Sequence, residues 1–307
     1  MRLRAVVTMV LLACAGPAHS AIAAEPEPQF ESMTIGKARV HLQFAPGVDA
    51  QKGKQLQSWI ARSGQVIADY FGSFPVPGVT ILVITGDGAA ITSGAAFSDP
   101  ELRIRVKVGR DTSPATYLSD WIMAHEMVHL AIPEVPRNQI WFHEGVATYV
   151  EIVARARAGL SGANGGWAEL FRNMEQGMPQ KGDRGLDFTP TWARTYWGGA
   201  MFCLMADVEL RKRSNNRIGL KDALRGIVAS GGNYSKTWPL EQTLKIADAA
   251  TGHTVLTDLH ALLKDNGNPP DLAGLWRDLG ISMHEGKLRL RDDAPLSAIR
   301  KAIIDNR

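Results

Sequence analysis

The sequence predicts an α+β fold with two lobes, a small mixed β-sheet lobe followed by a mainly helical lobe. Three observations lead to this prediction. Up to Pro136, short apolar runs with the period of strands surround one helical segment. After Pro136, almost every apolar pattern has the period of a helix. At the junction, an unusually apolar segment carries two histidines four positions apart. We place the two lobes at residues 35–136 and 137–307.

The first 23 residues have the pattern of a signal peptide. Met1–Arg4 is basic, Ala5–Ala13 is apolar, and Ala21-Ile22-Ala23 is an A-x-A cleavage site. The apolar run is too short to span a membrane. We therefore expect an exported protein, periplasmic or secreted, with no transmembrane span in the mature chain. An uncleaved anchor is the alternative.

Cysteine usage fits export without disulfides. The chain has two cysteines. Cys14 follows Leu11-Leu12-Ala13, which resembles a lipobox, so acylation of Cys14 is a second processing route. Otherwise Cys14 leaves with the signal peptide. Cys203 then stays alone in an apolar helical stretch, where a buried, inert thiol is expected.

The net charge gives no support for a nucleic-acid partner. The whole chain has a formal charge of +3, and residues 1–23 contribute two arginines and no acid, which leaves +1. A nearly neutral protein without a run of basic and aromatic residues lacks the electrostatic signature of nucleic-acid binding.

The elements expected in the first lobe follow from periodicity and turn residues. Leu102–Val108 alternates strictly, with Arg103, Arg105 and Lys107 on its polar face, and predicts a half-exposed edge strand. We interpret that basic face as solvated rather than as a binding patch. In order, the sequence predicts a loose leader over 24–34, one or two strands over 33–44, a helix over 50–71, a strand over 79–84, a loop over 86–100 and the strand over 102–108.

The segment 115–132 predicts one buried helix. It is apolar almost all round, which is typical of a helix without a solvent face. Ser113-Pro114 supplies an N-cap with proline at the first helical position, and Pro133 ends the helix.

This helix carries His125-Glu126-Met127-Val128-His129, an H-E-x-x-H sequence. Positions i and i+4 share one helix face, so His125 and His129 can bind one Zn²⁺. Glu126 can then act as general base on a zinc-activated water. The alternative is a pair of hydrogen-bonded core histidines, which leaves Glu126 unexplained.

Glu144 is the candidate for the third ligand that a catalytic zinc site requires. It lies in the next predicted helix, 138–158, after a turn that can bring this helix back antiparallel to the first. Gly145 would let the two helices approach closely. Further helices are expected over 194–213, 219–229, 238–249, 254–264, 271–279 and 295–305, with a short helical piece over 167–174 and a strand pair over 281–291.

Here the chain resembles a known group, the gluzincin zinc metallopeptidases. H-E-x-x-H followed by W-F-x-E-G-x-A-x-Y, here Trp141–Tyr149, is typical of that group. Tyr196–Met201, with Asp207 and Leu210-Arg211 further on, resembles the following helix of the glycyl aminopeptidase family. Leu275–Ile281 resembles the end of its catalytic region.

The resemblance covers about residues 35–300 and implies a gluzincin (thermolysin-like) two-lobed fold that forms one catalytic unit, without the PDZ domain of many members. It implies that Tyr196 donates to the oxyanion, with a packing role as the alternative. Gly198 replaces the usual Lys. Ser93–Phe97 stands where the family has an acidic segment that holds a free amino terminus, so the choice between endopeptidase and aminopeptidase stays open.

These patterns predict an exported, zinc-dependent metallopeptidase with one Zn²⁺ per chain and a peptide or protein substrate. The alternative is a non-catalytic zinc-containing envelope protein that binds peptides. Trp167 and Trp192 are candidates to line a cleft. Thr148 and Glu151 are candidate partners of the metal ligands, with ordinary helix packing as the alternative. The sequence leaves the oligomeric state open.

Overall fold

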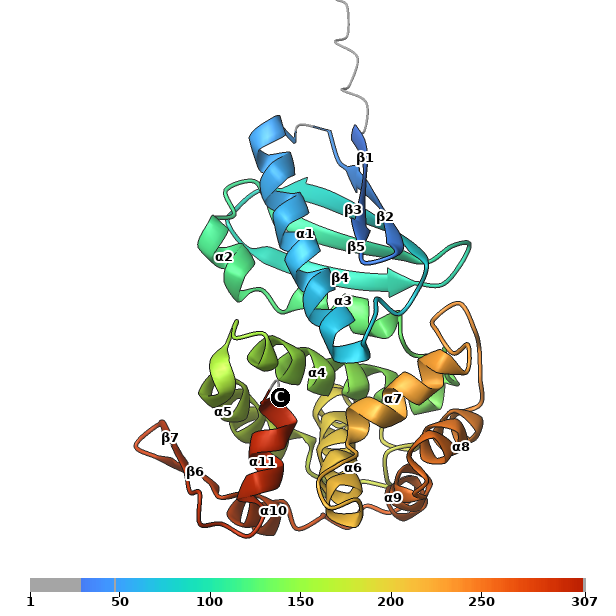
Figure 1. Ribbon diagram of the computed structural model, residues 1–307, viewed down its shortest axis with the longest axis vertical. Helices are drawn as coiled ribbons and strands as arrows, with labels where there is room; N and C mark the ends of the chain where they lie inside the picture. Colours follow the sequence, from blue (N-terminus) through green and yellow to red (C-terminus); the bar gives the residue numbers. More distant parts are fainter. Residues whose placement is uncertain (1–28, 47, 306–307) are drawn as a thin grey trace, which may run out of the picture.

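The computed structural model describes residues 29–46 and 48–305, and it has a mixed α+β architecture (Figure 1). The predicted signal peptide and Cys14 lie outside the described residues. A five-stranded sheet has the order β1-β2-β3-β5-β4, in which β2, β3 and β5 are parallel and the two edge strands are antiparallel to their neighbours. Its strands are β1 (Gln29–Ile35), β2 (Ala38–Phe44), β3 (Gly78–Gly86), β4 (Ile91–Phe97) and β5 (Arg103–Gly109).

One face of the sheet is apolar and covered, and the other is more polar. Buried residues alternate along each central strand, as in Val40, Leu42 and Phe44 of β2. Helix α1 (Ala50–Phe71) connects the parallel strands β2 and β3 and buries Leu56, Ile60 and Ile67. Asp49 caps this helix by accepting from the Lys52 backbone N–H at 2.7 Å.

Three expectations for the sheet were wrong. Residues 29–34 of the expected leader belong to β1. The segment 86–100, expected as a loop because of its small residues, contains the strand β4. As a result β5 is an internal strand, and β4 is the edge. The small residues of β4 leave room for a side chain that packs closely against this strand, as described below. The composition of β4 therefore resembles that of a loop.

The apolar segment 115–132 is not one helix. It forms α2 (Pro114–Ser119) and α3 (Ile122–His129), which are separated at Asp120. The Asp120 carboxylate accepts from the backbone N–H groups of Ile122 and Met123 at 3.1 and 3.0 Å, so it starts a new helix. Residue Trp121, at the break, is 46% exposed. Before Met123 only Tyr117 of this segment is buried, and burial is continuous from Met123 onward.

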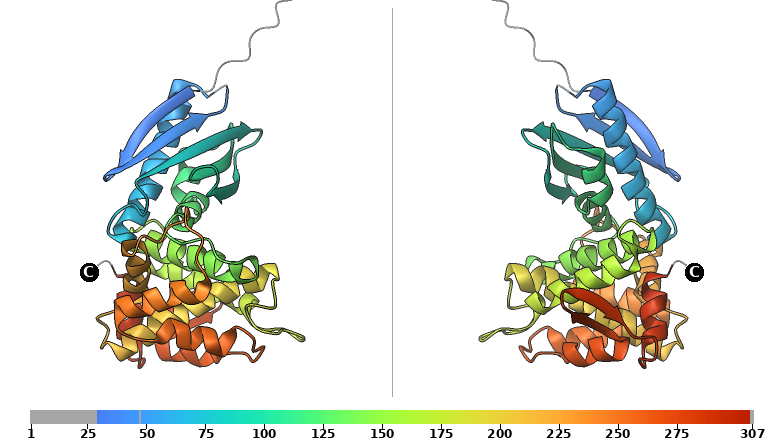
Figure 2. Two further views of the ribbon diagram at one scale, coloured as in Figure 1. Left: turned by 90° about the vertical axis from the view of Figure 1, so that its right-hand side faces the viewer. Right: turned by 90° about the vertical axis from the view of Figure 1, so that its left-hand side faces the viewer.

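The helical lobe is built around one almost completely buried helix, α4 (Ile140–Arg157). From Trp141 to Ala156 every residue of α4 is buried except Glu144. Figures 1 and 2 show α4 between the sheet lobe and the remaining helices. These are α5 (Gly162–Met174), the π-helix η3 (Arg194–Gly198), α6 (Gly199–Arg213), α7 (Leu220–Ala229), α8 (Leu240–Thr251), α9 (Val255–Leu263), α10 (Leu272–Leu279) and α11 (Ser297–Ile304), together with the hairpin β6 (Ile281–His284) and β7 (Lys287–Leu290).

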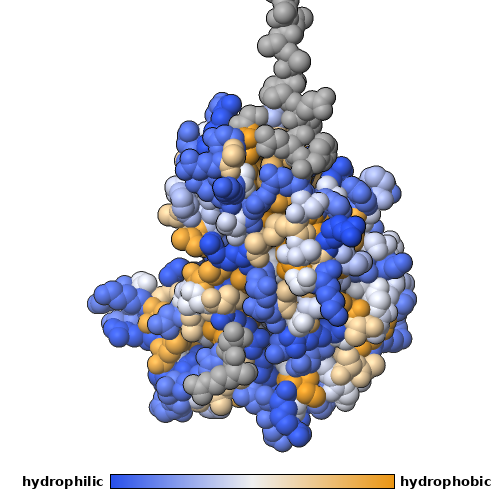
Figure 3. Space-filling view, turned by 45° about the horizontal axis from the view of Figure 1, so that its top comes forward, coloured by the Kyte–Doolittle hydropathy of each residue, from blue (hydrophilic) through white to orange (hydrophobic). Residues whose placement is uncertain are grey.

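The surface agrees with this burial pattern. In the view of Figure 3 it is mostly hydrophilic, and hydrophobic residues gather in small groups. Within residues 29–46 and 48–305, no helix combines the length and the apolar character needed to cross a bilayer.

Candidate metal centre

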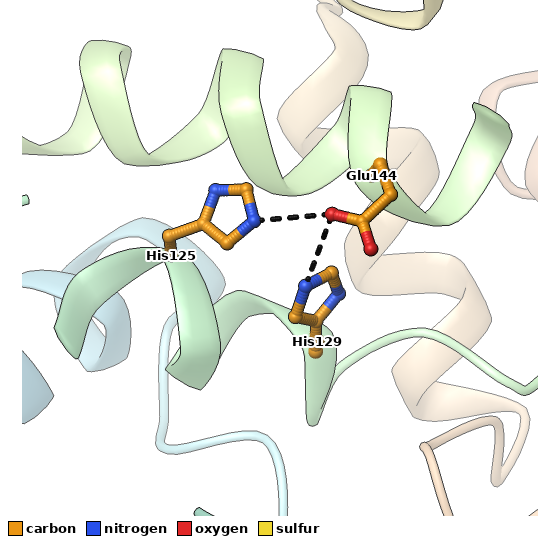
Figure 4. Close-up of side chains that lie close together, drawn as sticks. All are labelled: His125, His129 and Glu144. Atoms are coloured by element: carbon orange, nitrogen blue, oxygen red, sulfur yellow. Dashed lines mark hydrogen bonds and ion pairs between the residues drawn. The ribbon is translucent and has the colours of Figure 1, made fainter. Parts of the chain in front are cut away.

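Three predicted ligands converge at the boundary of the two lobes. His125 and His129 project from α3, and Glu144 projects toward them from α4 (Figure 4). The Nε2 atoms of His125 and His129 lie 3.2 and 3.5 Å from Oε2 of Glu144. All three ligand atoms lie within 4.8 Å of one another.

This arrangement fits a zinc ion. Two ligand atoms about 2.0–2.1 Å from a tetrahedral ion lie about 3.3–3.4 Å apart, close to the observed separations between nitrogen and oxygen. Burial acts to raise the pKa of Glu144, but hydrogen bonds from His125 and His129 hold it below its ordinary value. The carboxylate is thus anionic, as a ligand must be. The Nδ1 atoms of both histidines are buried without a hydrogen-bond partner in the described chain.

Glu144 is positioned by a contact between two glycines. A Cβ at Gly145 would lie 2.3 Å from the carbonyl carbon of Gly199, and a Cβ at Gly199 would lie 2.1 Å from the Trp141 carbonyl oxygen. The glycine therefore brings α4 against α6, whereas the sequence suggested a close approach to the metal helix. This contact holds the segment with Tyr196 beside Glu144.

The Glu126 side chain lies against the edge strand β4. A Cβ at Gly94 would lie 2.7 Å from Oε1 of Glu126, so the carboxylate packs directly against β4, and the backbone of Ala96 acts to lower its pKa. Burial raises the pKa of Glu126, and the charge of Glu144 adds to the effect. A carboxyl with a raised pKa next to a metal site is suited to take up a proton.

Aromatic rings flank His125. The Tyr196 ring stacks on the His125 ring with centroids 6.1 Å apart, and Trp192 stacks on Tyr196 at 5.5 Å. Trp121 meets His125 edge-on at 5.7 Å. Trp192 is 62% exposed. Burial and the charge of Glu144 raise the pKa of Tyr196, so its hydroxyl stays protonated and can donate. Tyr196 lies in η3, where the predicted regular helix is locally widened.

A different set of rings flanks His129. The His143 ring stacks on His129 with centroids 4.5 Å apart and planes 8° apart, and Tyr234 packs on His143 at 4.8 Å. His143 is buried and donates from Nε2 to the Ile132 carbonyl at 3.3 Å. Burial and the neighbouring His129 lower the pKa of His143 to about 3, so this ring is neutral.

Sequence reasoning missed Tyr234 and β4. Tyr234 lies between α7 and α8, about a hundred residues after the H-E-x-x-H motif, and its backbone N–H bonds to the Leu130 carbonyl directly after that motif. Burial, followed by the charges of Glu134, Glu144 and Glu126, raises the pKa of Tyr234 to about 12. Nothing in the local sequence signals this position.

The structure also places the other residues singled out from the sequence. Trp167 is buried in the core. Glu151 pairs with Arg155 at 3.1 Å, and the Thr148 hydroxyl has no partner in the described chain. Asp207 pairs with Arg211 at 2.7 Å, as their spacing suggests, but inside the core. Cys203 is a buried free thiol, as expected.

Comparison with known proteins gives structural matches only. No family model matches the chain, and no curated protein sequence matches it. An aminopeptidase N family protein from Idiomarina loihiensis has a TM-score of 0.63 at 15% identity, over 83% of this chain and 49% of that one. The M1 zinc metallopeptidase from Deinococcus radiodurans has a TM-score of 0.50 at 16% identity, over 80% of this chain and 53% of that one.

The chain has the gluzincin fold. This confirms the fold predicted from the H-E-x-x-H and W-F-x-E-G-x-A-x-Y segments. A variant of the Deinococcus radiodurans protein, solved with a Tyr-Ser-Ala substrate, matches with a TM-score of 0.50 at 18% identity over 80% of this chain and 53% of that one. The chain spans about half the length of these structures. The finer resemblance to the glycyl aminopeptidase family stays a prediction.

Proposed function

We propose that this protein is a zinc metallopeptidase that hydrolyses peptide bonds with Glu126 as general base. The convergence of His125, His129 and Glu144 carries the proposal, because three ligands leave a fourth zinc position for reactants. A bound zinc ion supplies Lewis acidity toward water and toward a carbonyl oxygen. A purely structural site needs no general base, so the placement of Glu126 argues against the non-catalytic alternative.

In this mechanism Glu126, Tyr196 and strand β4 have separate roles. Glu126 takes a proton from the attacking water and delivers it to the leaving amine. The Tyr196 hydroxyl, protonated because its pKa is raised, donates to the oxygen that becomes negative. Strand β4 has one unpaired edge in the described sheet, where an extended peptide can add as a further strand. Pairing there would hold the scissile bond beside Glu126.

A digest of a diverse peptide mixture by the zinc-loaded protein, analysed by mass spectrometry, tests the proposal. Glu126→Gln keeps the shape of the side chain and removes the base, so we expect rates to fall by about 10²–10⁴-fold. Zinc content should stay at one ion per chain. Internal cuts would indicate an endopeptidase, and stepwise loss from the amino end an aminopeptidase. Equal cleavage by the variant would refute this mechanism.

We also propose that the protein acts outside the cytoplasm. The support is the pattern of residues 1–23, with its A-x-A site ending at Ala23. Mass spectrometry of the mature amino terminus tests this. A start at Ala24 supports the signal peptide, and an acylated Cys14 supports the lipoprotein route. An intact Met1 would contradict both.

A further inference from the structure

The carboxylate of Glu134 occupies a defined position at the end of the edge strand β4. Ser98, directly after β4, donates from its hydroxyl to Oε1 of Glu134 at 3.3 Å. The Thr237 hydroxyl donates to Oε2 at 3.3 Å. Two backbone bonds fix the residue as well, from the Glu134 N–H to the Lys236 carbonyl at 2.7 Å and from the Trp238 N–H to the Glu134 carbonyl at 2.9 Å. Two separate segments, Ser98 after β4 and the loop 236–238, thus hold Glu134 in place.

Glu134 is half-buried and lacks a cationic partner. Within the part of the chain that the structure describes, Ser98 and Thr237 are its side-chain partners, and no Lys, Arg or His forms an ion pair with it. Arg103 and Arg105 of the adjacent strand β5 lie over the Phe97 ring, at 5.3 and 5.2 Å from its centroid. Two neutral donors leave an anionic carboxylate with the capacity to accept a cation.

Glu134 lies in line with the proposed peptide path. Gly94 and Ala96 of β4 contact Glu126, and Ser98 contacts Glu134. At about 3.3 Å per residue, Ser98 lies about 13 Å further along the strand than Gly94. A peptide paired with β4 would therefore reach Glu134 with a residue roughly three or four positions from the bond held beside Glu126.

We propose that Glu134 is a specificity-determining residue that binds a cationic group of the peptide, three or four residues from the scissile bond. The group is an ammonium or guanidinium, supplied by a Lys or Arg side chain or by the free amino terminus of a short peptide. This inference rests on the proposed peptidase function for the path of the peptide. It adds to that function a preferred substrate class, peptides with a positive charge at one fixed distance from the cut.

Binding to zinc-loaded Glu126→Gln protein tests the inference without requiring turnover. A set of fluorescent peptides carries Lys at one position at a time, each matched by a peptide with Gln there, and each prepared with a free and an acetylated amino terminus. We expect one Lys position to bind about tenfold more tightly than its Gln counterpart, as is reasonable for a half-buried charged hydrogen bond. Dependence on Lys identifies a side chain, and dependence on acetylation identifies the amino terminus.

Two further variants separate charge recognition from loop packing. In Glu126→Gln/Glu134→Gln the tenfold preference should disappear, while affinity for the Gln peptides is retained. In Glu126→Gln/Glu134→Lys it should reverse in favour of Glu at the same position, which a packing role cannot produce. Glu126→Gln/Glu101→Gln removes an exposed acid from the segment after β4 and should leave the preference unchanged.

The outcomes distinguish this inference from the proposed function. Binding without a preference for a cation at any position, or a preference that persists in the Glu134 variants, overturns the inference alone. Absence of cleavage by the wild-type protein, together with charge-selective binding, refutes the peptidase and supports the inference. If no peptide binds to the variant, the inference is wrong, and the peptidase is judged by the cleavage test alone.

Discussion

The two sides of the metal centre are built from similar rings but differ in exposure. Beside His125, Trp192 stacks on Tyr196, and Trp121 meets His125 directly. These two tryptophans are 62% and 46% exposed. Beside His129, His143 is 2% exposed and lies between the ligand and Tyr234. Exposed aromatic rings can contact a substrate, whereas the buried ring of His143 can only hold a ligand in orientation. We therefore infer that the His125 side meets the substrate and the His129 side supports the metal.

The largest expected difference between the two sides is in the loss of kcat when the hydroxyl of each tyrosine is removed. Tyr196→Phe removes a donor to the oxyanion, so kcat should fall by about 10²–10³-fold with little change in KM. Tyr234→Phe keeps the ring that packs on His143, so kcat should change by less than about fivefold. Steady-state kinetics on one peptide substrate measures both. Equal losses in the two variants would show that both hydroxyls act on the reaction and would break the comparison.

The next difference concerns metal affinity. His143→Leu keeps the buried volume but removes the stacked ring and its bond to the Ile132 carbonyl, so zinc should bind about 10–100-fold more weakly. Trp121→Leu on the opposite side should change zinc affinity by less than about threefold. Competition with a fluorescent chelator gives both values. A weaker zinc site in the Trp121 variant alone would reverse the assignment of the two sides.

The smallest effect is expected at the exposed ring. Trp192→Ala should raise KM about two- to tenfold for peptides with a bulky apolar residue near the cut, because one stacked aromatic contact is lost. The kcat value and zinc content should stay close to those of the wild-type protein. Kinetics on a matched pair of peptides, one with Phe and one with Ala, checks this. An equal rise in KM for both peptides would show that Trp192 does not select the side chain.

The convergence of His125, His129 and Glu144 was predictable because the signals for it are local. Two histidines one helical turn apart identify a site whatever the rest of the chain does. The facing helix could be placed from the turn between the two segments, which gave Glu144. Periodicity likewise placed α1, β3 and most later helices close to their observed bounds. In each case the residues on which the prediction depends lie within about twenty positions of one another in the sequence.

Other features depended on partners that are distant in sequence. The strand β4 was read as a loop because Gly94 and its small neighbours are shaped by contact with Glu126, not by strand propensity. The break at Asp120 was hidden inside an apolar run that also contains exposed residues. Tyr234 and Glu134 reach the site through backbone bonds between loops. The hydrophobic periodicity of a segment carries no information about such contacts.

The contact of Gly145 with Gly199 acts as a spacer of fixed length. Most distances between helices depend on side chains, which can change rotamer when a neighbour is altered. Here the separation between the helix with Glu144 and the segment with Tyr196 is set by two backbones that already touch, so it cannot shrink and can grow only if the helices part. Changes in the surrounding core therefore have little effect on the distance between Glu144 and the phenol of Tyr196.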